Sequence, residues 1–348
     1  MSIRVARLYA PGDLRIEADL APEAGPGEVV VAIGAGGICG SDLHYFRHGG
    51  IGAIRVREPI ILGHEAAGTV EALGTGVTGL AIGDRVALNP SNPCGGCDYC
   101  LAGAERHCLT MRFRGSAMYL PHEQGFFRDR LVVGAAQCFP VSTEVPMAEA
   151  ALAEPLAVCR HAMRQAGDLA GRRVLVTGAG PIGALCAALA RHYGAAEVVV
   201  TDLEDAALDV AGKVGATTLV NVATRPDGLT TYEADKGRFD VTFECSASEA
   251  ALRSAIACTR PTGTIVQVGL MGETPIPVNQ LVAKELRLVG THRFDVEFGE
   301  AVDLINTRAL TLGPVVTHSV PVSDAAEAMA LAGDRSRVVK VQLAFGLS

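Results

Sequence analysis

The sequence predicts an α/β protein in which a β-rich module accompanies a doubly wound parallel sheet. The first part of the chain alternates apolar and polar residues between glycine-rich turns, the pattern of an antiparallel sheet. From about Pro146, Ala-rich helical patterns alternate with short apolar strands, as in a parallel sheet. A length of 348 residues with 49% hydrophobic content also indicates two domains, because single cores rarely grow past roughly 250–300 residues.

Several antiparallel strands are expected in the β-rich module. Turn signals separate the first of them at Pro11-Gly12-Asp13 and at Pro26-Gly27-Glu28. The expected strands cover residues 5–9, 14–16, 29–33, 63–73 and 84–88.

A glycine-rich turn organises the second module. Residues 174–177 form an apolar strand, a GxGxxG turn and an Ala/Leu-rich helix follow, and a second strand at 198–201 ends at Asp202. This arrangement presents backbone N–H groups and a positive helix end to a dinucleotide pyrophosphate, and a tight turn in some other α/β sheet is the alternative. The turn residues are Gly178, Ala179, Gly180, Pro181, Ile182 and Gly183.

Asp202 indicates which dinucleotide binds. A carboxylate at this strand end accepts hydrogen bonds from the ribose hydroxyls of NAD and repels the extra phosphate of NADP. The next residues, Leu203-Glu204-Asp205, offer no arginine to reverse that preference. NAD is therefore favoured over NADP.

The remaining strands complete the predicted sheet and return to the first module. Strands are expected at 218–220, 241–244, 264–268 and 286–290, with helices at 249–258 and 298–306. Val268, Gly269 and Thr291 are expected to contact the cofactor. Strands at 315–320 and 338–343 are expected to rejoin the β-rich module. The predicted domains are therefore 1–150, completed by 291–348, and a nucleotide-binding domain at 151–290.

Four closely spaced cysteines predict a structural zinc site. Cys94, Cys97, Cys100 and Cys108 lie in one polar loop, and four thiolates can enclose a tetrahedral zinc ion with no open position. An iron–sulfur cluster and four unliganded core thiols are the alternatives.

A second group of metal-binding residue types is sparser. Cys39, His64 and Glu65 combine a thiol, an imidazole and a carboxylate, and a mixed set with an open position suits a catalytic zinc ion. On spacing alone, a buried cysteine and a core histidine are the alternative.

Composition excludes several other classes of protein. A net charge of −8 and a pI of 5.6 argue against nucleic acid or an anionic membrane as partner. The first residues lack an apolar signal region, and no run of about 18 apolar residues occurs, so neither export nor membrane insertion is expected. The ten cysteines are then read as reduced thiols and metal ligands in a cytoplasmic protein.

Several motifs in order resemble the zinc-dependent medium-chain alcohol and polyol dehydrogenases along essentially the whole chain. They are G-x-C-x-S-D-x-H at 37–44, Gly63-His64-Glu65, the four-cysteine loop, Glu154-Pro155-Leu156 and the glycine turn. Within that family the chain is similar to the polyol branch, and residues 111–116 most resemble L-idonate 5-dehydrogenases.

The resemblance implies a GroES-like catalytic domain, a Rossmann domain and one catalytic and one structural zinc ion. It makes Cys39 and His64 ligands of the catalytic zinc, with Glu65 and Glu154 as the carboxylates that share the remaining coordination. It also implies that Ser41 and His44 carry the released proton to solvent. The alternative for Ser41 is a hydroxyl that only stabilises a turn. The alternative for His44 is an exposed side chain with no part in the reaction.

The resemblance further implies oxidation of L-idonate to 5-ketogluconate, and the reverse reduction, in a homodimer or homotetramer. Tyr45 is expected to line the pocket, and Arg112, Arg114 and Arg293 are candidates to bind the substrate carboxylate, since arginine matches it with two donors. A sorbitol- or xylitol-type polyol dehydrogenase is the main alternative. L-Threonine 3-dehydrogenase and a non-catalytic NAD-binding protein are more distant ones.

Overall fold

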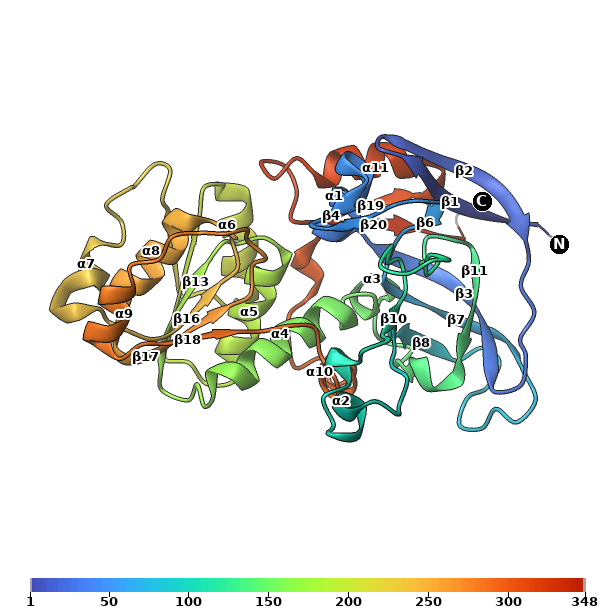
Figure 1. Cartoon of the computed structure of the whole chain (residues 1–348), viewed down its shortest axis with the longest axis horizontal. Helices are drawn as coiled ribbons and strands as arrows, with labels where there is room; N and C mark the ends of the chain where they lie inside the picture. The colour runs from blue at the N-terminus through green and yellow to red at the C-terminus, as the bar shows by residue number, and fades with distance from the viewer. Residues whose placement is uncertain (1, 347–348) are drawn as a thin grey trace.

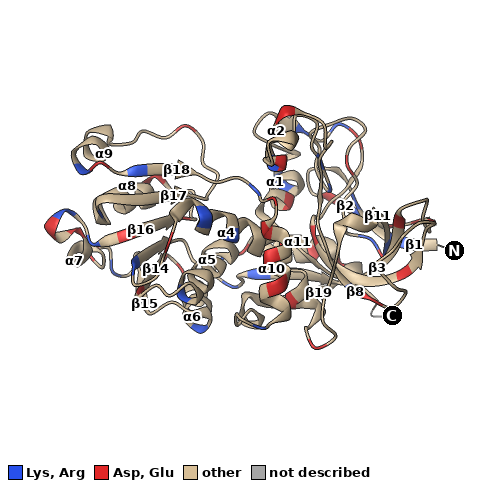
Figure 2. Ribbon diagram, turned by 90° about the horizontal axis from the view of Figure 1, so that it is seen from below, with Lys and Arg blue, Asp and Glu red and all other residues tan. Residues whose placement is uncertain are grey.

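The computed structural model describes residues 2–346 and places a parallel-sheet domain beside a β-rich domain (Figure 1). The predicted fold class is confirmed. Lys, Arg, Asp and Glu are scattered over both domains (Figure 2). Within residues 2–346, no helix is long and apolar enough to span a bilayer.

The β-rich domain is built around one large sheet. Its strand order is β12-β8-β7-β3-β20-β19, and β11 also pairs with β3. Smaller sheets in the order β2-β1-β6, β10-β9 and β4-β5 accompany it. The strands are β1 (Ser2–Ala10), β2 (Asp13–Leu20), β3 (Glu28–Gly37), β4 (Gly50–Ile51), β5 (Ile54–Arg55), β6 (Ile60–Ile61), β7 (Glu65–Leu73), β8 (Arg85–Leu88), β9 (Ser91–Asn92), β10 (Arg112–Phe113), β11 (Arg130–Gly134), β12 (Cys138–Pro140), β19 (Val316–Pro321) and β20 (Lys340–Ala344).

The end of the chain enters this sheet. β20 pairs antiparallel with β3, with Gln342 opposite Gly37, and parallel with β19. Val341 and Leu343 of β20 are buried in the same core as Val29 and Val31 of β3. The two ends of the chain therefore share one hydrophobic core.

The second domain contains a six-stranded sheet in which every neighbouring pair is parallel. The strand order is β15-β14-β13-β16-β17-β18, which is the 3-2-1-4-5-6 order of dinucleotide-binding sheets. Its strands are β13 (Arg173–Thr177), β14 (Glu197–Asp202), β15 (Thr218–Asn221), β16 (Phe239–Glu244), β17 (Thr259–Gln267) and β18 (Arg287–Gly290). β17 begins five residues earlier than expected, at Thr259, where it pairs with Phe239 before a register shift.

Helices pack on both sheets and between the domains (Figure 1). The eleven α-helices within residues 2–346 are α1 (Gly40–His48), α2 (Asp98–Leu101), α3 (Met147–Ala150), α4 (Ala153–Ala166), α5 (Pro181–His192), α6 (Asp205–Val214), α7 (Thr230–Glu233), α8 (Glu249–Cys258), α9 (Val278–Lys284), α10 (Glu297–Asn306) and α11 (Ala325–Ala332). Short 3₁₀ turns occupy Glu105–His107, Ala135–Gln137, Ala234–Lys236, Gly313–Val315 and Val322–Asp324.

A buried carboxylate joins α4 to α10. Glu297 Oε1 lies 3.0 Å from His161 Nδ1 and 3.1 Å from Arg164 Nε, and Glu297 Oε2 accepts a hydrogen bond from the backbone of Asp295 at 2.8 Å. Burial alone raises the pKa of Glu297, but these hydrogen bonds outweigh burial and lower the pKa to about 2. The charged form of Glu297 therefore stabilises this contact.

Acid is expected to weaken the folded state through Glu297. Its pKa is about 2 in the folded chain and 4.5 as a free side chain, so its contribution is complete above about pH 5 and is lost as pH falls toward 2. At neutral pH it amounts to about 3 kcal/mol. The melting temperature of Glu297→Gln should therefore fall less between pH 6 and pH 4 than that of the wild type. Glu300→Gln, on the same helix, is the control, and equal pH profiles for wild type and Glu297→Gln would refute this assignment.

Candidate active site

Two segments of the β-rich domain bring metal-binding side chains together. Cys39 follows β3 and is the N-cap of α1, whereas His64 and Glu65 stand at the start of β7. Their ligand atoms all lie within 4.8 Å of one another. His64 and Glu65 are buried, and Cys39 is partly exposed. The three side chains therefore offer sulfur, nitrogen and oxygen to one cation while one side of the group stays open.

Asp42 fastens these two segments together. Its buried carboxylate accepts hydrogen bonds from the backbone N–H of Cys39 at 2.9 Å and of Gly63 at 3.0 Å. Its Oδ1 also lies 3.8 Å from His64 Nδ1. Asp42 belongs to the G-x-C-x-S-D-x-H motif, but the sequence analysis assigned it no role. Its position three residues after Cys39, as in a capping box, is the sequence signal that could have revealed this role.

The charges around this group favour a bound cation. Burial lowers the pKa of His64, but Asp42, Cys39 and Glu154 outweigh it and raise the pKa to about 10. Burial, aided by Glu65, raises the pKa of Glu154 to about 7, although His64 opposes the shift. Glu154 is buried on α4, but within residues 2–346 its carboxylate does not belong to the group of ligand atoms that lie within 4.8 Å of one another. Several acidic groups in one buried place fit a divalent metal ion.

Lys340 neutralises one of these carboxylates. Its Nζ lies 2.6 Å from Glu65 Oε1 and 2.5 Å from Oε2, and the two side chains are only 2% and 1% exposed. Burial lowers the pKa of Lys340, but Glu65 outweighs it and the pKa is raised. Lys340 lies 275 residues from Glu65 in sequence, so only the entry of β20 into the sheet brings the pair together.

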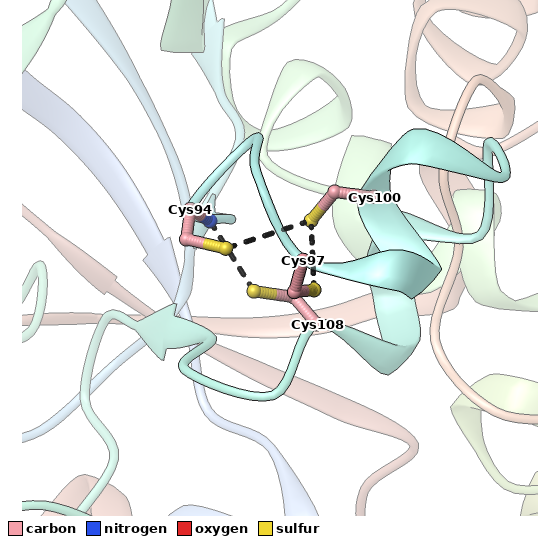
Figure 3. Close-up of side chains that lie close together, drawn as sticks. All are labelled: Cys94, Cys97, Cys100 and Cys108. Atoms are coloured by element: carbon pink, nitrogen blue, oxygen red, sulfur yellow. Dashed lines mark hydrogen bonds between the residues drawn. The ribbon is translucent and has the colours of Figure 1, made fainter.

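The four-cysteine loop forms a second compact group (Figure 3). Cys97 Sγ lies 3.5 Å from Cys100 Sγ, Cys94 Sγ lies 4.0 Å from Cys100 Sγ, and all four sulfurs lie within 4.8 Å of one another. Sulfurs bound to a tetrahedral zinc at about 2.3 Å stand about 3.8 Å apart, so the residues fit that ion. The backbone N–H of Gly96, with other donors, lowers the pKa of Cys94 to about 6, which favours the thiolate.

This loop is attached to the segment that enters α10. Arg106 pairs with Asp295, and its backbone N–H donates to Asp295 Oδ1 at 2.6 Å. The His107 ring stacks on His292 with ring centroids 6.0 Å apart. Zinc in the loop would thus stabilise the segment that connects the two domains.

The glycine turn has the geometry that phosphate binding needs. Gly178 has a φ of 88°, a conformation that side chains disfavour. A Cβ on Gly183 would stand 1.7 Å from the carbonyl oxygen of Gly178, so only glycine lets α5 approach β13. Gly180 is the N-cap of α5, and Pro181 and Ile182 begin the helix. Two backbone positions therefore require glycine, and the helix start stays accessible to an anion.

Asp202 closes the other side of this turn. Its Oδ2 accepts a hydrogen bond from the Ala179 N–H at 2.5 Å, and its Oδ1 accepts one from Leu203 N–H at 2.7 Å. A cleft between the domains is lined by Gly180, Pro181 and Asp202 on one side and by Ile38, Gly40 and Leu43 on the other. The cleft therefore joins the glycine turn to the start of α1, near Cys39.

Arg335 also lines this cleft and was missed by sequence reasoning. Its Nη2 lies 3.8 Å from where a Cβ on Gly180 would stand. A guanidinium at the N-terminus of α5 suits a pyrophosphate. Nothing near Arg335 in sequence signals this role, because it follows α11 in the other domain.

The other expected cofactor residues lie at the ends of neighbouring strands. The N–H groups of Val268 and Gly269 both donate to the carbonyl of Glu244, at 2.9 and 2.8 Å. The Thr291 hydroxyl is buried and has no hydrogen-bond partner within residues 2–346. An unpaired buried hydroxyl suits a polar group of a cofactor, because burial without a partner is costly.

The structure brings one of the three candidate arginines to the Cys39 group. The Arg293 guanidinium lies 4.1 Å from the centroid of the Phe113 ring, and that ring lies 5.6 Å from the His64 ring. Burial lowers the pKa of Arg293, while Glu154 and the hydroxyl of Tyr45 oppose the shift. Tyr45 is itself buried.

Arg112 and Arg114 have other partners. Arg112 pairs with Glu123 and lies over the Tyr119 ring, 5.1 Å from its centroid. Arg114 donates to the backbone carbonyl of Val132 in β11 at 3.3 Å. The structure brings neither guanidinium into contact with the Cys39 group within the part of the chain that it describes.

Ser41 and His44 both lie on α1. Ser41 is partly exposed and His44 is exposed, one helical turn apart on the same face. The His44 ring neighbours His48, with centroids 5.8 Å apart. This face leads from the Cys39 end of the helix to solvent.

Known protein families match both domains. The alcohol dehydrogenase GroES-like domain matches residues 25–143, and the zinc-binding dehydrogenase domain matches residues 181–307. L-Idonate 5-dehydrogenase (NAD(P)(+)) of Escherichia coli is 41% identical over 317 residues, 91% of each chain. Sorbitol dehydrogenase of Homo sapiens is 37% identical over 325 residues, 92% of this chain and 90% of that protein.

Solved structures give the same result. The crystal structure of L-idonate 5-dehydrogenase from Escherichia coli matches with a TM-score of 0.94 and 38% identity over 99% of both chains. A zinc-binding dehydrogenase from Sinorhizobium meliloti bound to NADP matches at 0.89, with 27% identity over 99% of both. The chain is an NAD(P)-dependent alcohol oxidoreductase of the polyol and sugar-acid type. The metal-binding residues, the glycine turn and the domain matches place it in the zinc-dependent medium-chain alcohol dehydrogenase family.

Proposed function

We propose that the enzyme oxidises L-idonate to 5-ketogluconate with NAD and catalyses the reverse reduction. The similarity to L-idonate 5-dehydrogenase over nine-tenths of both chains carries this proposal. A sorbitol- or xylitol-type activity is the second candidate, favoured by the similarity to sorbitol dehydrogenases. Residues 151–290 are proposed as the cofactor domain, and 1–150 with 291–348 as the catalytic domain.

Different residues of the site bind the metal ion and transfer the proton. Cys39 and His64 would hold the catalytic zinc, with Glu65 or Glu154 as the carboxylate. A zinc ion held by these residues would supply Lewis-acid polarisation of the alcohol oxygen, and bound NAD would supply the hydride acceptor. Ser41 takes the proton released from the alcohol and His44, one turn along α1, passes it to solvent.

A substrate panel tests this function. Purified enzyme is assayed with NAD against L-idonate, sorbitol, xylitol and L-threonine by following NADH absorbance. We expect kcat/KM to be highest for L-idonate. A higher value for sorbitol or xylitol would establish the second candidate instead.

We propose that Asp202 selects NAD over NADP. Asp202→Ala is expected to lower kcat/KM for NAD by roughly 10- to 100-fold, because a hydrogen bond to a charged group is worth about 1.5–3 kcal/mol. The value for NADP should change far less, since Ala no longer repels its phosphate. Asp209→Ala, an exposed acid on α6, is the matched control. An unchanged ratio of kcat/KM for NAD to kcat/KM for NADP would mean that another residue recognises the ribose.

We also propose that the enzyme is a cytoplasmic homodimer or homotetramer. All ten cysteines are free thiols, which suits a reducing compartment. β18 is an edge strand, and exposed apolar side chains lie on and near it: Leu270 (86% exposed), Val278 (57%), Val282 (71%) and Leu288 (37%). Such an edge suits pairing with a second copy of the chain, which light scattering of the purified protein would measure.

A further inference from the structure

A pocket with two arginines lies beside the site described above. It has a volume of about 320 Å³ and lies between the β4–β5 hairpin and residues 117–120. Arg55 and Arg57 contribute its charged lining, and Tyr119 contributes an aromatic ring. A basic pocket contrasts with the chain's net charge of −8. The pocket therefore has the charge that an anionic group of a ligand requires.

Neither arginine is paired with an acid. Arg55 Nη1 donates to the backbone carbonyl of Ile54 at 3.0 Å and also to that of Gly52, and both acceptors are uncharged. Within residues 2–346, no carboxylate oxygen lies within 4.0 Å of either guanidinium. The backbone contacts hold Arg55 at the hairpin and leave its other donors free.

The acids nearest in sequence to the pocket have other partners. Glu58 Oε1 accepts the backbone N–H of His122 at 2.6 Å, and the Glu123 carboxylate pairs with Arg112. The positive charge of Arg112 is thereby balanced. Glu58 does not line the pocket, so within residues 2–346 Arg55 and Arg57 are the charged side chains of its lining.

The pocket adjoins the catalytic group. The backbone N–H of Ala117, in the pocket wall, donates to the Tyr45 hydroxyl at 3.3 Å. Tyr119, which lines the pocket, packs against Arg112, with the guanidinium 5.1 Å from its ring centroid. The next residue, Phe113, lies 4.1 Å from the Arg293 guanidinium and 5.6 Å from the His64 ring. Tyr45 lies on α1, whose N-cap is Cys39, so it connects the pocket wall to the helix that begins at the Cys39 group. A linear substrate with its alcohol at the Cys39 group would extend past Tyr45 toward this pocket.

We propose that Arg55 and Arg57 bind the carboxylate of an acyclic sugar-acid substrate while the alcohol at the other end reacts. The inference rests on the proposed function, since it assigns the anionic end of that substrate. Two guanidinium groups offer a carboxylate several charged donors. Because these contacts lie away from the reacting carbon and are the same before and during reaction, they act mainly on KM.

The test compares an acid with its neutral counterpart. L-Idonate and L-iditol differ only in that the polyol carries CH₂OH in place of the carboxylate. We expect Arg55→Gln/Arg57→Gln to lower the idonate-to-iditol ratio of kcat/KM by roughly 10- to 100-fold, mainly through KM for idonate. Arg253→Gln, an exposed arginine on α8 paired with Glu249, should leave the ratio unchanged. If wild type oxidises idonate and the double variant keeps the same ratio, the inference is wrong and the proposed function stands.

Two further assays cover the cases in which L-idonate is not the preferred substrate. If wild type oxidises only neutral polyols, the proposed function fails, and inhibition of that reaction by D-gluconate then tests the pocket. Inhibition weakened about tenfold or more in the double variant supports the pocket, and unchanged inhibition overturns it. If a hexitol 1-phosphate is a better substrate than idonate and the double variant loses that activity, the pocket serves phosphate and its assignment to a carboxylate is overturned.

Discussion

Replacing Cys39 by serine is expected to lower kcat by ~10³-fold or more while the chain stays folded. The lost thiolate removes one ligand of the catalytic zinc, whose polarising effect is worth several kcal/mol, at about 1.4 kcal/mol per tenfold in rate. Metal analysis should give about two zinc ions per chain for wild type and about one for this variant, because the four-cysteine group is separate.

Two comparisons make the Cys39 result specific. Cys258→Ser, at a buried cysteine outside both groups, should keep both zinc ions. Cys97→Ser should instead lose the structural zinc and lower the melting temperature, because the loop loses a ligand of its stabilising ion. Mild chelation should remove the catalytic zinc and the activity first. A wild-type enzyme that is fully active with one zinc ion would contradict the two-site assignment.

Lys340→Met is expected to give the largest loss of stability of any single change to the site. In the zinc-free protein it leaves the buried Glu65 carboxylate without its lysine partner, and breaking one side of a buried pair costs about 3–5 kcal/mol. The melting temperature measures this loss. The double variant Glu65→Gln/Lys340→Met should recover part of it, because no charge is then left unpaired.

A surface lysine provides the control for Lys340. Lys213 is exposed on α6, and Lys213→Met should change stability by no more than about 0.5 kcal/mol. If Lys340→Met unfolds at the same temperature as wild type, Lys340 does not balance Glu65 in solution.

Local patterns made part of the site predictable from sequence. The glycine turn, Asp202 and the four cysteines each lie within a short stretch whose spacing fixes the geometry, so the turn and the sulfur group could be expected before the structure. The alternation of strands and helices likewise predicted the parallel sheet, which the strand order confirms. The early start of β17 was not predicted, because its first residue pairs with Phe239 of β16 before a register shift, and the local sequence does not show that pairing.

Contacts between distant segments could not be read from the sequence. Lys340 meets Glu65 across 275 residues, and Arg335 reaches Gly180 from the other domain. Arg112 and Arg114 were, with Arg293, candidates to bind the substrate carboxylate, but Arg112 pairs with Glu123 and Arg114 donates to a backbone carbonyl. Which charges are free to bind a ligand depends on such pairings, and only the fold sets them.

The entry of β20 into the first sheet affects how the chain is made. A ribosome completes residues 173–290, which form the whole parallel sheet, before it synthesises the strand that pairs with β3. The parallel sheet can thus fold early, while β3 still lacks β20 at one edge and Glu65 still lacks Lys340. During that interval an exposed strand edge is open to wrong pairing, so we expect chaperones to act on this domain first. The domain that begins the chain is the one that finishes folding second.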